Sequence, residues 1–162
     1  HDKLTGLYNR SYIENISNQW LENAYKRKES IVCIVFDIDG FKSINDNYGH
    51  LFGDEIIKLV GKACSDIVRE TDLIGRFGGD EFVIVLKDIS LENGQKKAEK
   101  MLDSIRKLKI YKDNNHIPIT MSIGVGDNLK CNLKEFNELF NYADMRLYKA
   151  KKNGKNQVCA SD

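Results

Sequence analysis

The architecture of this chain is clearest in the segment Arg76-Phe77-Gly78-Gly79-Asp80-Glu81-Phe82. Apolar runs flank it, Leu73-Ile74 before and Phe82-Val83-Ile84-Val85-Leu86 after. A glycine pair between two strand-like runs indicates a β-hairpin, because glycine reaches the positive φ angles that a tight turn requires. The next two residues, Asp80 and Glu81, are acidic, and in a strand their side chains point to opposite faces. We therefore expect one of them to point toward an acid of a neighbouring strand while the other faces away.

The hairpin by itself is compatible with two interpretations. Two carboxylates beside a glycine turn leave room for a bulky anionic ligand such as a metal-bound nucleotide. The same residues can equally form a solvated turn with ordinary surface acids, and for the hairpin alone this second interpretation is favoured.

The length and composition indicate one soluble domain spanning residues 1–162, large enough to bury a core. The net charge is +1, so no global field attracts the chain to nucleic acid or to a membrane. No apolar run has the length of a membrane span, and none has the features of a signal peptide. The four scattered cysteines are typical of reduced thiols in a cytoplasmic protein. Because the chain begins at His1 rather than Met, we expect it to be excised from a longer protein.

A second pair of acids follows the apolar run Ile31 to Phe36, whose β-branched residues indicate a central strand covered on both faces. The run ends in Asp37-Ile38-Asp39-Gly40, where alternation places Asp37 and Asp39 on one face and Ile38 on the other. Acids at the end of a buried strand are costly unless they are paired, hydrated or bound to a cation. One of them can cap the next helix. With a second acidic turn expected nearby, a metal site is the better interpretation.

Apolar side chains recur at helical spacing in several segments. The predicted helices cover residues 9–28, a short segment from Phe41 to Tyr48, a longer segment from Asp54 to Val68, one after Ser90 and one after Asn132. Asp54 and Ser90 stand at N-cap positions, and Asn132 with Glu135 resembles a capping box. The last helix ends in lysines that include Lys151, followed by Lys155. Lysines are favourable at a helix C-terminus without any ligand, and they are also what a triphosphate requires.

Two further strands and one charged pair complete the chain. The alternation of Ile117 to Val125 indicates a half-buried strand, and residues 156–160 are expected to add a short edge strand. Arg69 and Asp72 close the helix before the hairpin, and their spacing alone favours a plain surface ion pair over a ligand site. The order of elements predicts an α+β fold, with a mixed, mainly antiparallel sheet surrounded by helices and containing the hairpin.

Several motifs in one order identify a family that the separate patterns do not. They are Asp2-Lys3-Leu4-Thr5-Gly6-Leu7-Tyr8-Asn9-Arg10, Phe36-Asp37-Ile38-Asp39-Gly40-Phe41-Lys42, Asn45-Asp46, His50-Leu51-Phe52-Gly53-Asp54, Gly78-Gly79-Asp80-Glu81-Phe82, Ser122-Ile123-Gly124-Val125 and the segment from Ala143-Asp144 to Asn156. Over nearly its whole length the chain resembles a GGDEF domain, the diguanylate cyclase catalytic domain of bacteria. The resemblance implies a central sheet like that of nucleotide cyclases and polymerase palm domains.

The resemblance also implies an activity. Two GTP molecules would be joined into cyclic di-GMP with release of two pyrophosphates, which makes the domain a nucleotidyltransferase. Each domain would bind one GTP, and two copies would face each other as a homodimer. The cofactor would be Mg²⁺ or Mn²⁺. The domain would belong to a multidomain signalling protein and work in the cytoplasm, with no nucleic-acid partner and with a membrane only through upstream domains.

Residue roles follow from the resemblance, position by position. Asp37, the backbone carbonyl of Ile38 and Asp80 would hold the metal, and Glu81 would assist there or in proton transfer. The expected GTP-binding residues are Phe41, Lys42, Asn45, His50, Asp54, Gly78, Gly79, Lys151 and Lys155, with Asn45 and Asp54 reading guanine and the lysines meeting the phosphates. Many family members carry arginine where this chain has Lys155, so charge is kept but bidentate contact is lost. Arg69 and Asp72 match an inhibitory site at which the product would bind.

Two alternatives accompany this interpretation. A degenerate GGDEF module would bind GTP or cyclic di-GMP and regulate a partner without catalysis, but such modules usually show a broken signature, and here the acids and glycines are intact. A cyclase that also accepts ATP is disfavoured by Asp54, because a carboxylate accepts hydrogen bonds from guanine but repels the acceptor edge of adenine.

Overall fold

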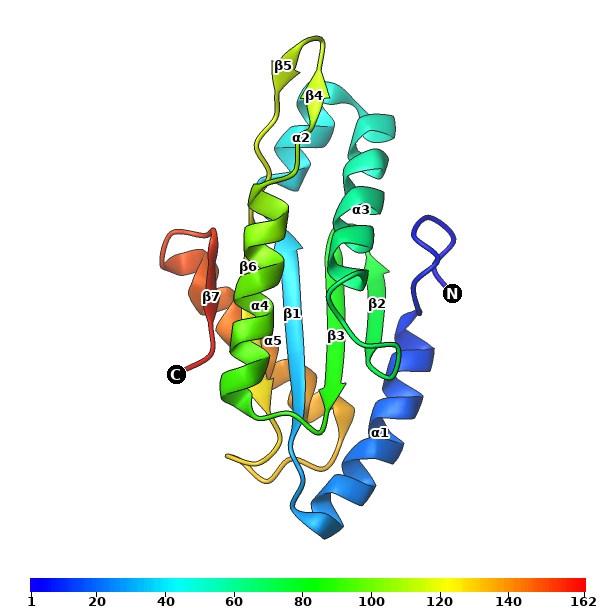
Figure 1. The fold of residues 1–162 in the computed structure, drawn as a ribbon, viewed down its shortest axis with the longest axis vertical. Coiled ribbons are helices and arrows are strands. Elements are labelled where there is room, and N and C mark those ends of the chain that lie inside the picture. The colour runs from blue at the N-terminus through cyan, green and yellow to red at the C-terminus, as the bar shows by residue number, and fades with distance from the viewer.

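All 162 residues are described by a computed structural model, drawn as a ribbon in Figure 1. Its centre is a five-stranded sheet in the order β2-β3-β1-β6-β7. The strands are β1 (Ile31–Ile38), β2 (Leu73–Gly78), β3 (Glu81–Lys87), β6 (Met121–Asp127) and β7 (Gln157–Cys159). Neighbouring strands are antiparallel except for β6 and β7, which are parallel. The expected α+β fold, the hairpin and the C-terminal edge strand are thereby confirmed.

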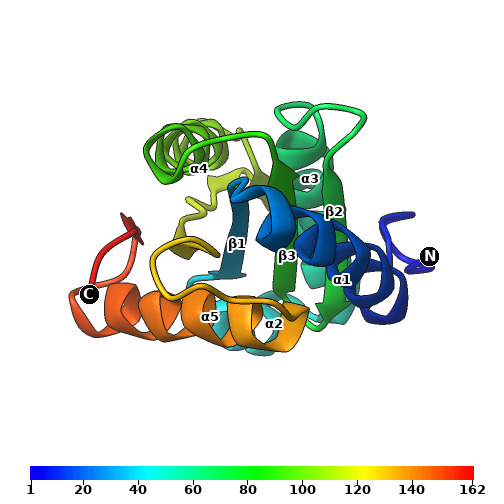
Figure 2. The ribbon, with the colours of Figure 1, turned by 90° about the horizontal axis from the view of Figure 1, so that it is seen from below.

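Helices cover both faces of this sheet, as Figure 2 shows from below. They are α1 (Arg10–Arg27), α2 (Phe41–Tyr48), α3 (His50–Ser65), α4 (Leu91–Arg106) and α5 (Phe136–Lys152). One hydrophobic cluster joins the sheet to α3 and α4, and a second joins the opposite face to α1 and α5. The domain therefore has three layers with the sheet in the middle.

Strand β1 supplies both clusters by simple alternation. Val32, Ile34 and Phe36 point into the cluster with α3 and α4, whereas Cys33 and Val35 point into the cluster with α1 and α5. All five side chains are fully buried. The prediction of a central strand covered on both faces is correct, and β1 ends with its acids at the border of a dry core.

Strand β6 corrects one expectation. It runs from Met121 to Asp127 rather than from Ile117, and every residue in it is buried rather than half of them. A Cβ atom on Gly124 would lie 2.1 Å from the carbonyl oxygen of Ala143 and 2.2 Å from the amide nitrogen of Leu147, so the backbone of α5 rests directly on the strand. The small residues that looked like a solvent-facing row instead allow the close approach of a helix.

Helix boundaries correct three further expectations. Helix α3 begins at His50 after Gly49, which has a φ of +89°, so Asp54 lies one turn inside the helix and is not its N-cap. The same helix ends at Ser65 and does not reach Arg69. The capping box of α5 is formed by Glu135 and Glu138, not by Asn132 and Glu135. Helix α1 over residues 10–27 and the N-cap role of Ser90, which accepts a 3.1 Å hydrogen bond from the backbone N–H of Asn93, agree with the sequence.

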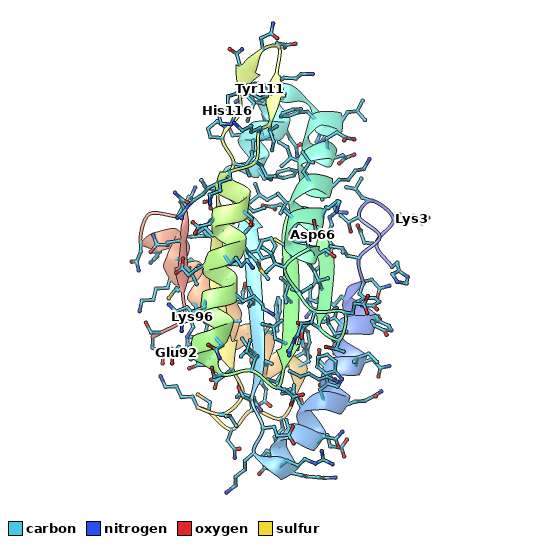
Figure 3. All side chains as sticks on the ribbon, viewed as in Figure 1. Lys3, Asp66, Glu92, Lys96, Tyr111 and His116 are labelled. Atoms are coloured by element: carbon cyan, nitrogen blue, oxygen red, sulfur yellow. The ribbon has the colours of Figure 1, made fainter.

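A short hairpin of β4 (Tyr111–Lys112) and β5 (Asn115–His116) was not anticipated by the apolar pattern, because its residues are mostly exposed. It projects from one end of the domain, where Figure 3 labels Tyr111 and His116. Their ring centroids lie 5.4 Å apart across the two strands. None of the helices is long and apolar enough to cross a membrane.

Candidate functional site

The glycine hairpin turns one residue later than the sequence suggested. Strand β2 ends at Gly78 and β3 begins at Glu81, so Gly79 and Asp80 form the turn, and Gly78 and Gly79 have φ angles of +133° and +50°. A carboxylate oxygen of Asp80 accepts a 3.1 Å hydrogen bond from the backbone N–H of Ile38. Glu81 pairs directly with Asp37 across the strands. Because Asp80 lies in the turn, both acids converge on the end of β1, and the expectation that one of them faces away is wrong.

The acids that meet here form a cluster of like charges. Burial first, and the negative charge of Asp37 second, raise the pKa of both Asp80 and Glu81 above the usual range. Helix α5 adds Asp144, whose pKa is raised by burial and by the same Asp37. We define these four residues, Asp37, Asp80, Glu81 and Asp144, as the acidic cluster. Asp144 is not among the site residues predicted from the sequence; the available signal is its position between the buried residues Ala143 and Leu147.

Lys151 is the cation that directly neutralises part of this cluster. Its ammonium group forms an ion pair with the carboxylate of Asp37. Burial lowers the pKa of Lys151, but its hydrogen bond with Asp37 and the charges of Asp80 and Asp144 outweigh that effect and raise it overall. One ammonium among four carboxylates leaves an excess of negative charge.

Asp39 has a different environment from Asp37. Its carboxylate accepts hydrogen bonds from the Thr120 hydroxyl at 2.7 Å, the Ser122 hydroxyl at 2.6 Å and the backbone N–H of Asn156 at 3.0 Å. These three donors hold the carboxylate in place and tie the segment after α5, which includes Lys155, to the end of β1. Of the two acids that end the strand, Asp39 therefore acts as a structural anchor, whereas Asp37 has only the ammonium of Lys151 as a side-chain hydrogen-bond partner.

The donors at the end of β1 fit a hard divalent cation. No group of three His, Cys, Asp or Glu side chains has the arrangement of a preformed metal cage. Magnesium does not need one, because it is commonly held by one or two carboxylates together with water and substrate phosphates. The carboxylates of Asp37 and Asp80 and the carbonyl of Ile38 are oxygen donors of that kind. A bound cation would relieve the repulsion that raises the pKa values of the acidic cluster.

A second group of predicted residues meets where α2 approaches α3. The side-chain oxygen of Asn45 is buried and has no hydrogen-bond partner. A Cβ atom on Gly53 would lie 1.9 Å from that oxygen and 3.2 Å from Cζ of Phe41. Gly53 thus allows Asn45 to occupy this position, although Gly53 is not among the site residues predicted from the sequence. Asp54 follows Gly53 in α3. The unsatisfied acceptor of Asn45 is a group that a ligand N–H could satisfy.

The remaining predicted contacts lie at the surface around these groups. Lys42 at the start of α2, His50 at the start of α3 and Lys155 after α5 are exposed and form no ion pair with any acid. A Cβ atom on Gly78 or Gly79 would meet nothing within 4 Å, so the outer side of the hairpin is open.

Arg69 and Asp72 form a separate, more structured pair than expected. The Asp72 side chain is 0% exposed, and it accepts hydrogen bonds from Nε and Nη2 of Arg69 at 3.2 and 3.1 Å. Lys97 of α4 approaches it to 3.8 Å. The pair is therefore not a plain surface ion pair, since its carboxylate is desolvated. Asp72 precedes the first residue of β2 and the glycine turn follows the last, so the two sites are roughly 20 Å apart along the strand.

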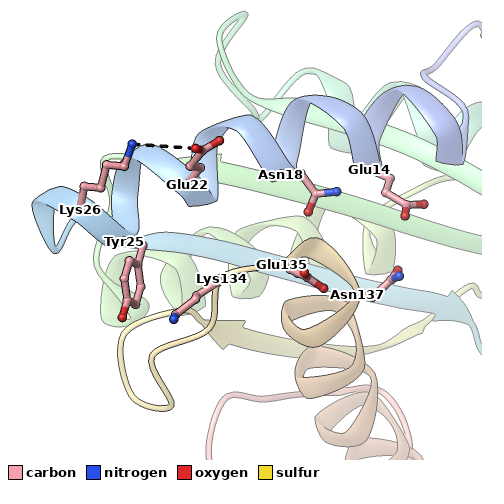
Figure 4. A pocket seen from close by; sticks show the side chains of 8 residues that line it. All are labelled: Glu14, Asn18, Glu22, Tyr25, Lys26, Lys134, Glu135 and Asn137. Carbon is pink, nitrogen blue, oxygen red and sulfur yellow. Dashed lines mark ion pairs between the residues drawn. The ribbon is translucent and has the colours of Figure 1, made fainter.

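A groove of about 440 Å³ lies away from both sites, between α1 and the start of α5. Figure 4 shows its lining, in which Lys26 pairs with Glu22 at 3.8 Å. The side-chain oxygen of Asn18 accepts a 2.7 Å hydrogen bond from the backbone N–H of Phe136. The Asn18 contact joins α1 to the start of α5, whereas Lys26 and Glu22 pair within α1. Neither contact supplies a reactive group, so the acidic cluster is the stronger candidate for chemistry.

Comparison with known proteins identifies the family of this chain. Residues 1–157 match the family described as "Diguanylate cyclase, GGDEF domain". Diguanylate cyclase DosC of Escherichia coli K12 is 36% identical over 157 residues, which are 97% of this chain and 34% of DosC. The chain thus spans about a third of the length of this curated relative.

Two solved structures share the whole fold. The GGDEF domain of DgcB from Caulobacter crescentus, in complex with c-di-GMP, has a TM-score of 0.90 and 27% identity, with 98% of this chain and 94% of that chain covered. The active GGEEF domain of a diguanylate cyclase from Vibrio cholerae has a TM-score of 0.88 and 31% identity, with 96% and 98% covered.

The charge repulsion in the acidic cluster predicts a pH-dependent gain in stability for Asp144→Asn. The folded-state pKa of Asp144 is raised, so stability falls as pH rises from the unfolded value of about 3.9 through the folded one. Removing the charge should raise Tm at pH 7 by about 1–3 °C, and the gain should vanish near pH 3, where the wild-type carboxyl is protonated in both states. Thermal unfolding without divalent cations measures this.

Asp46→Asn is the matched control, because Asp46 is exposed on α2 and forms no ion pair. It should leave Tm unchanged at both pH values. A gain for Asp144→Asn that is as large at pH 3 as at pH 7 would contradict the electrostatic explanation.

Proposed function

Because this chain belongs to the GGDEF domain family of diguanylate cyclases, we propose that it condenses two GTP molecules into cyclic di-GMP and releases two pyrophosphates. The observation that supports this most is the convergence of Asp37, Asp80 and Glu81 beside an open glycine hairpin. Family membership alone does not require an active domain, whereas an intact acidic cluster is what the reaction needs.

The reaction consists of two equivalent displacements. In each one, the 3′-hydroxyl oxygen of one nucleotide bonds to the α-phosphorus of the other, and the α–β phosphoanhydride bond breaks. Pyrophosphate leaves with the electron pair of that bond, and the hydroxyl proton passes to a base. Since each domain holds one nucleotide, two domains must face each other, so we propose a homodimer as the catalytic form.

Asp37, the Ile38 carbonyl and Asp80 are the proposed ligands of Mg²⁺ or Mn²⁺. A divalent cation bound there would lower the pKa of the attacking hydroxyl and neutralise charge on the leaving pyrophosphate. Glu81 lies beside these ligands without a direct counter-ion, and its raised pKa suits a proton acceptor as well as a contact to the metal.

The remaining polar groups are proposed to hold the nucleotide. Lys42, Lys151 and Lys155 supply positive charge for the phosphates, and the open backbone of Gly78 and Gly79 allows close approach. Asn45 and Asp54, with Phe41 and His50 nearby, are proposed to bind guanine. The buried, unpartnered oxygen of Asn45 supports this, because guanine offers N–H donors at its Watson–Crick edge.

Arg69 and Asp72 are proposed to bind the product as an inhibitor. The exposed guanidinium of Arg69 can grip a phosphate or a guanine, and the relative whose structure contains c-di-GMP shows that a domain of this fold binds that molecule. The distance of this pair from the glycine turn makes the proposed inhibition allosteric. As GTP is a cytoplasmic nucleotide, the proposed location is the cytoplasm.

The proposed activity is tested by incubating the chain with GTP and Mg²⁺ at high protein concentration and separating products by chromatography. Wild type should form cyclic di-GMP. Asp80→Ala should lower the rate by about 100-fold or more, since a metal ligand and an N–H acceptor are lost together. Asp66→Ala, which removes an exposed acid paired only with Lys62, should keep the wild-type rate.

Fusing a coiled coil to the N-terminus provides the second arm of this test. Activity that appears only in the fused dimer would support the two-domain mechanism. Continued absence of product together with tight GTP binding would overturn the enzyme assignment and favour a regulatory binding module.

Gly53→Ala should weaken guanine binding while leaving the fold intact. The added Cβ atom would displace the flexible end of Asn45 rather than the backbone, so the fold should persist while the dissociation constant for GTP rises about tenfold or more. Isothermal titration and thermal unfolding measure the two effects. Gly61→Ala on the same helix is the control, because its Cβ would come no closer than 3.4 Å to a neighbour. Wild-type affinity in Gly53→Ala would exclude Asn45 from the guanine site.

Arg69→Ala should weaken product inhibition without changing the initial rate. Loss of a charged hydrogen-bond donor, worth roughly 1.5–3 kcal/mol, should raise the half-inhibitory concentration of cyclic di-GMP about tenfold or more. Initial rates at increasing product concentration measure this, with Lys62→Ala as the surface control. Equal inhibition of Arg69→Ala and wild type would reject the site.

A further inference from the structure

Arg10, the first residue of α1, carries a guanidinium that forms no ion pair with an acidic side chain. Its guanidinium lies over the ring of Phe77 in β2 at 5.2 Å and over the ring of Phe140 in α5 at 5.1 Å, measured to the ring centroids. The two rings are stacked on each other at 5.7 Å. Arg10 is exposed and takes part in no ion pair or side-chain hydrogen bond. Two aromatic rings from different elements therefore hold an unsatisfied guanidinium in one place.

Arg10 lies on the opposite side of the acidic cluster from Lys151. It is the positive charge that acts on Glu81, which pairs with Asp37 in β1. Lys151 instead contacts Asp37 from the C-terminal end of α5. Phe140, beneath Arg10, precedes Lys151 by eleven residues in α5, which corresponds to roughly 16 Å along the helix axis. The two cations therefore approach the acidic cluster from different positions along α5.

A pocket of about 560 Å³ opens beside Arg10 along the hairpin, lined in part by Lys3, Arg76 and Gly78. Arg76 is already engaged, because it donates to Asp2 at 2.9 Å and to the carbonyl oxygen of Gly79 at 2.8 Å. Lys3 and Arg10 are the cations of this pocket that no carboxylate neutralises. The pocket thus offers a net positive surface next to the open glycine backbone.

The unused N–H donors of the Arg10 guanidinium are suited to a phosphate ligand. A cation over an aromatic ring at an exposed site is weakly held, and this contact leaves the N–H donors of the guanidinium unused. Those donors form a planar fork that matches two oxygens of a phosphate. The proposed reaction brings a second nucleotide to this end of the domain, where Arg10 is the oriented guanidinium beside the acids.

We propose, on the basis of the proposed function, that Arg10 is a catalytic residue that binds a phosphate oxygen of the nucleotide held by the opposing domain. In an in-line displacement the entering and leaving oxygens lie on opposite sides of the phosphorus. Lys151 stands on the side of the phosphates that the domain itself holds, and Arg10 stands across the acidic cluster from it. Arg10 therefore meets the entering nucleotide, and its positive charge stabilises the charge that develops as the new bond forms.

The test separates binding of the domain's own nucleotide from turnover in Arg10→Ala and Arg10→Lys. Binding is measured with 3′-deoxy-GTP and Mg²⁺ on the dilute domain, because this analogue lacks the attacking hydroxyl. Turnover is measured with GTP at high protein concentration. Arg27→Ala is the matched control, as Arg27 lies at the other end of α1 and pairs only with Glu29.

Arg10→Ala should keep the affinity for 3′-deoxy-GTP and the thermal stability, while kcat falls about 100-fold or more. Arg10→Lys should recover part of that loss, because it keeps the charge but not the fork. Dilute guanidinium chloride should partly rescue Arg10→Ala and leave Arg27→Ala unaffected, a response that a purely structural arginine would not give.

Three results would overturn the proposal. Wild-type turnover in Arg10→Ala would reject any catalytic contact while leaving the proposed cyclase activity intact. A loss of 3′-deoxy-GTP affinity by the same factor as kcat would assign Arg10 to the domain's own nucleotide. Absence of cyclic di-GMP from the wild type, including the fused dimer, would reject the proposed function and this inference together.

Discussion

The contact on which the rest of this structure depends is the seat of α5 on β6. Gly124 brings the helix backbone so close to the strand that a single added carbon would overlap Ala143 and Leu147. This contact fixes the helix in both rotation and translation, since interiors packed at this density allow little sliding. As a result Phe140, Asp144 and Lys151 form one row along the helix above the ends of β1 and β3.

The same contact between α5 and β6 brings together acidic side chains that repel one another. The folded domain holds Asp144 near Asp37, Asp80 and Glu81, although burial and repulsion disfavour the ionised forms of three of them. Burial of the apolar clusters on the two faces of the sheet supplies favourable free energy that offsets this repulsion. Lys151 offsets part of it without a ligand. An arrangement that costs stability in the free protein is typical of a site prepared for a cation or for chemistry.

Much of the fold could be predicted from the sequence, and the errors have identifiable causes. The β-branched run of β1 and the glycine hairpin were correctly located, because both patterns depend on local chain geometry. The turn was expected one residue early, since Gly78 and Gly79 both have positive φ and only the register between β2 and β3, in which Gly78 pairs with Glu81, separates them. The alternation in β6 was misread as half-exposure, because a small residue facing a helix and one facing water look alike in sequence.

The sequence by itself determined which elements form, which strand is central, and that acids and glycines meet at a hairpin, because spacing along the chain controls these features. Only the tertiary structure decided which distant side chains share the site: Asp144 with Asp37, Gly53 against Asn45, Asp39 with the segment after α5, and Arg10 over the rings of two other elements. These contacts join residues far apart in the chain. Their proximity is set by how helices pack on the sheet, which local patterns do not encode.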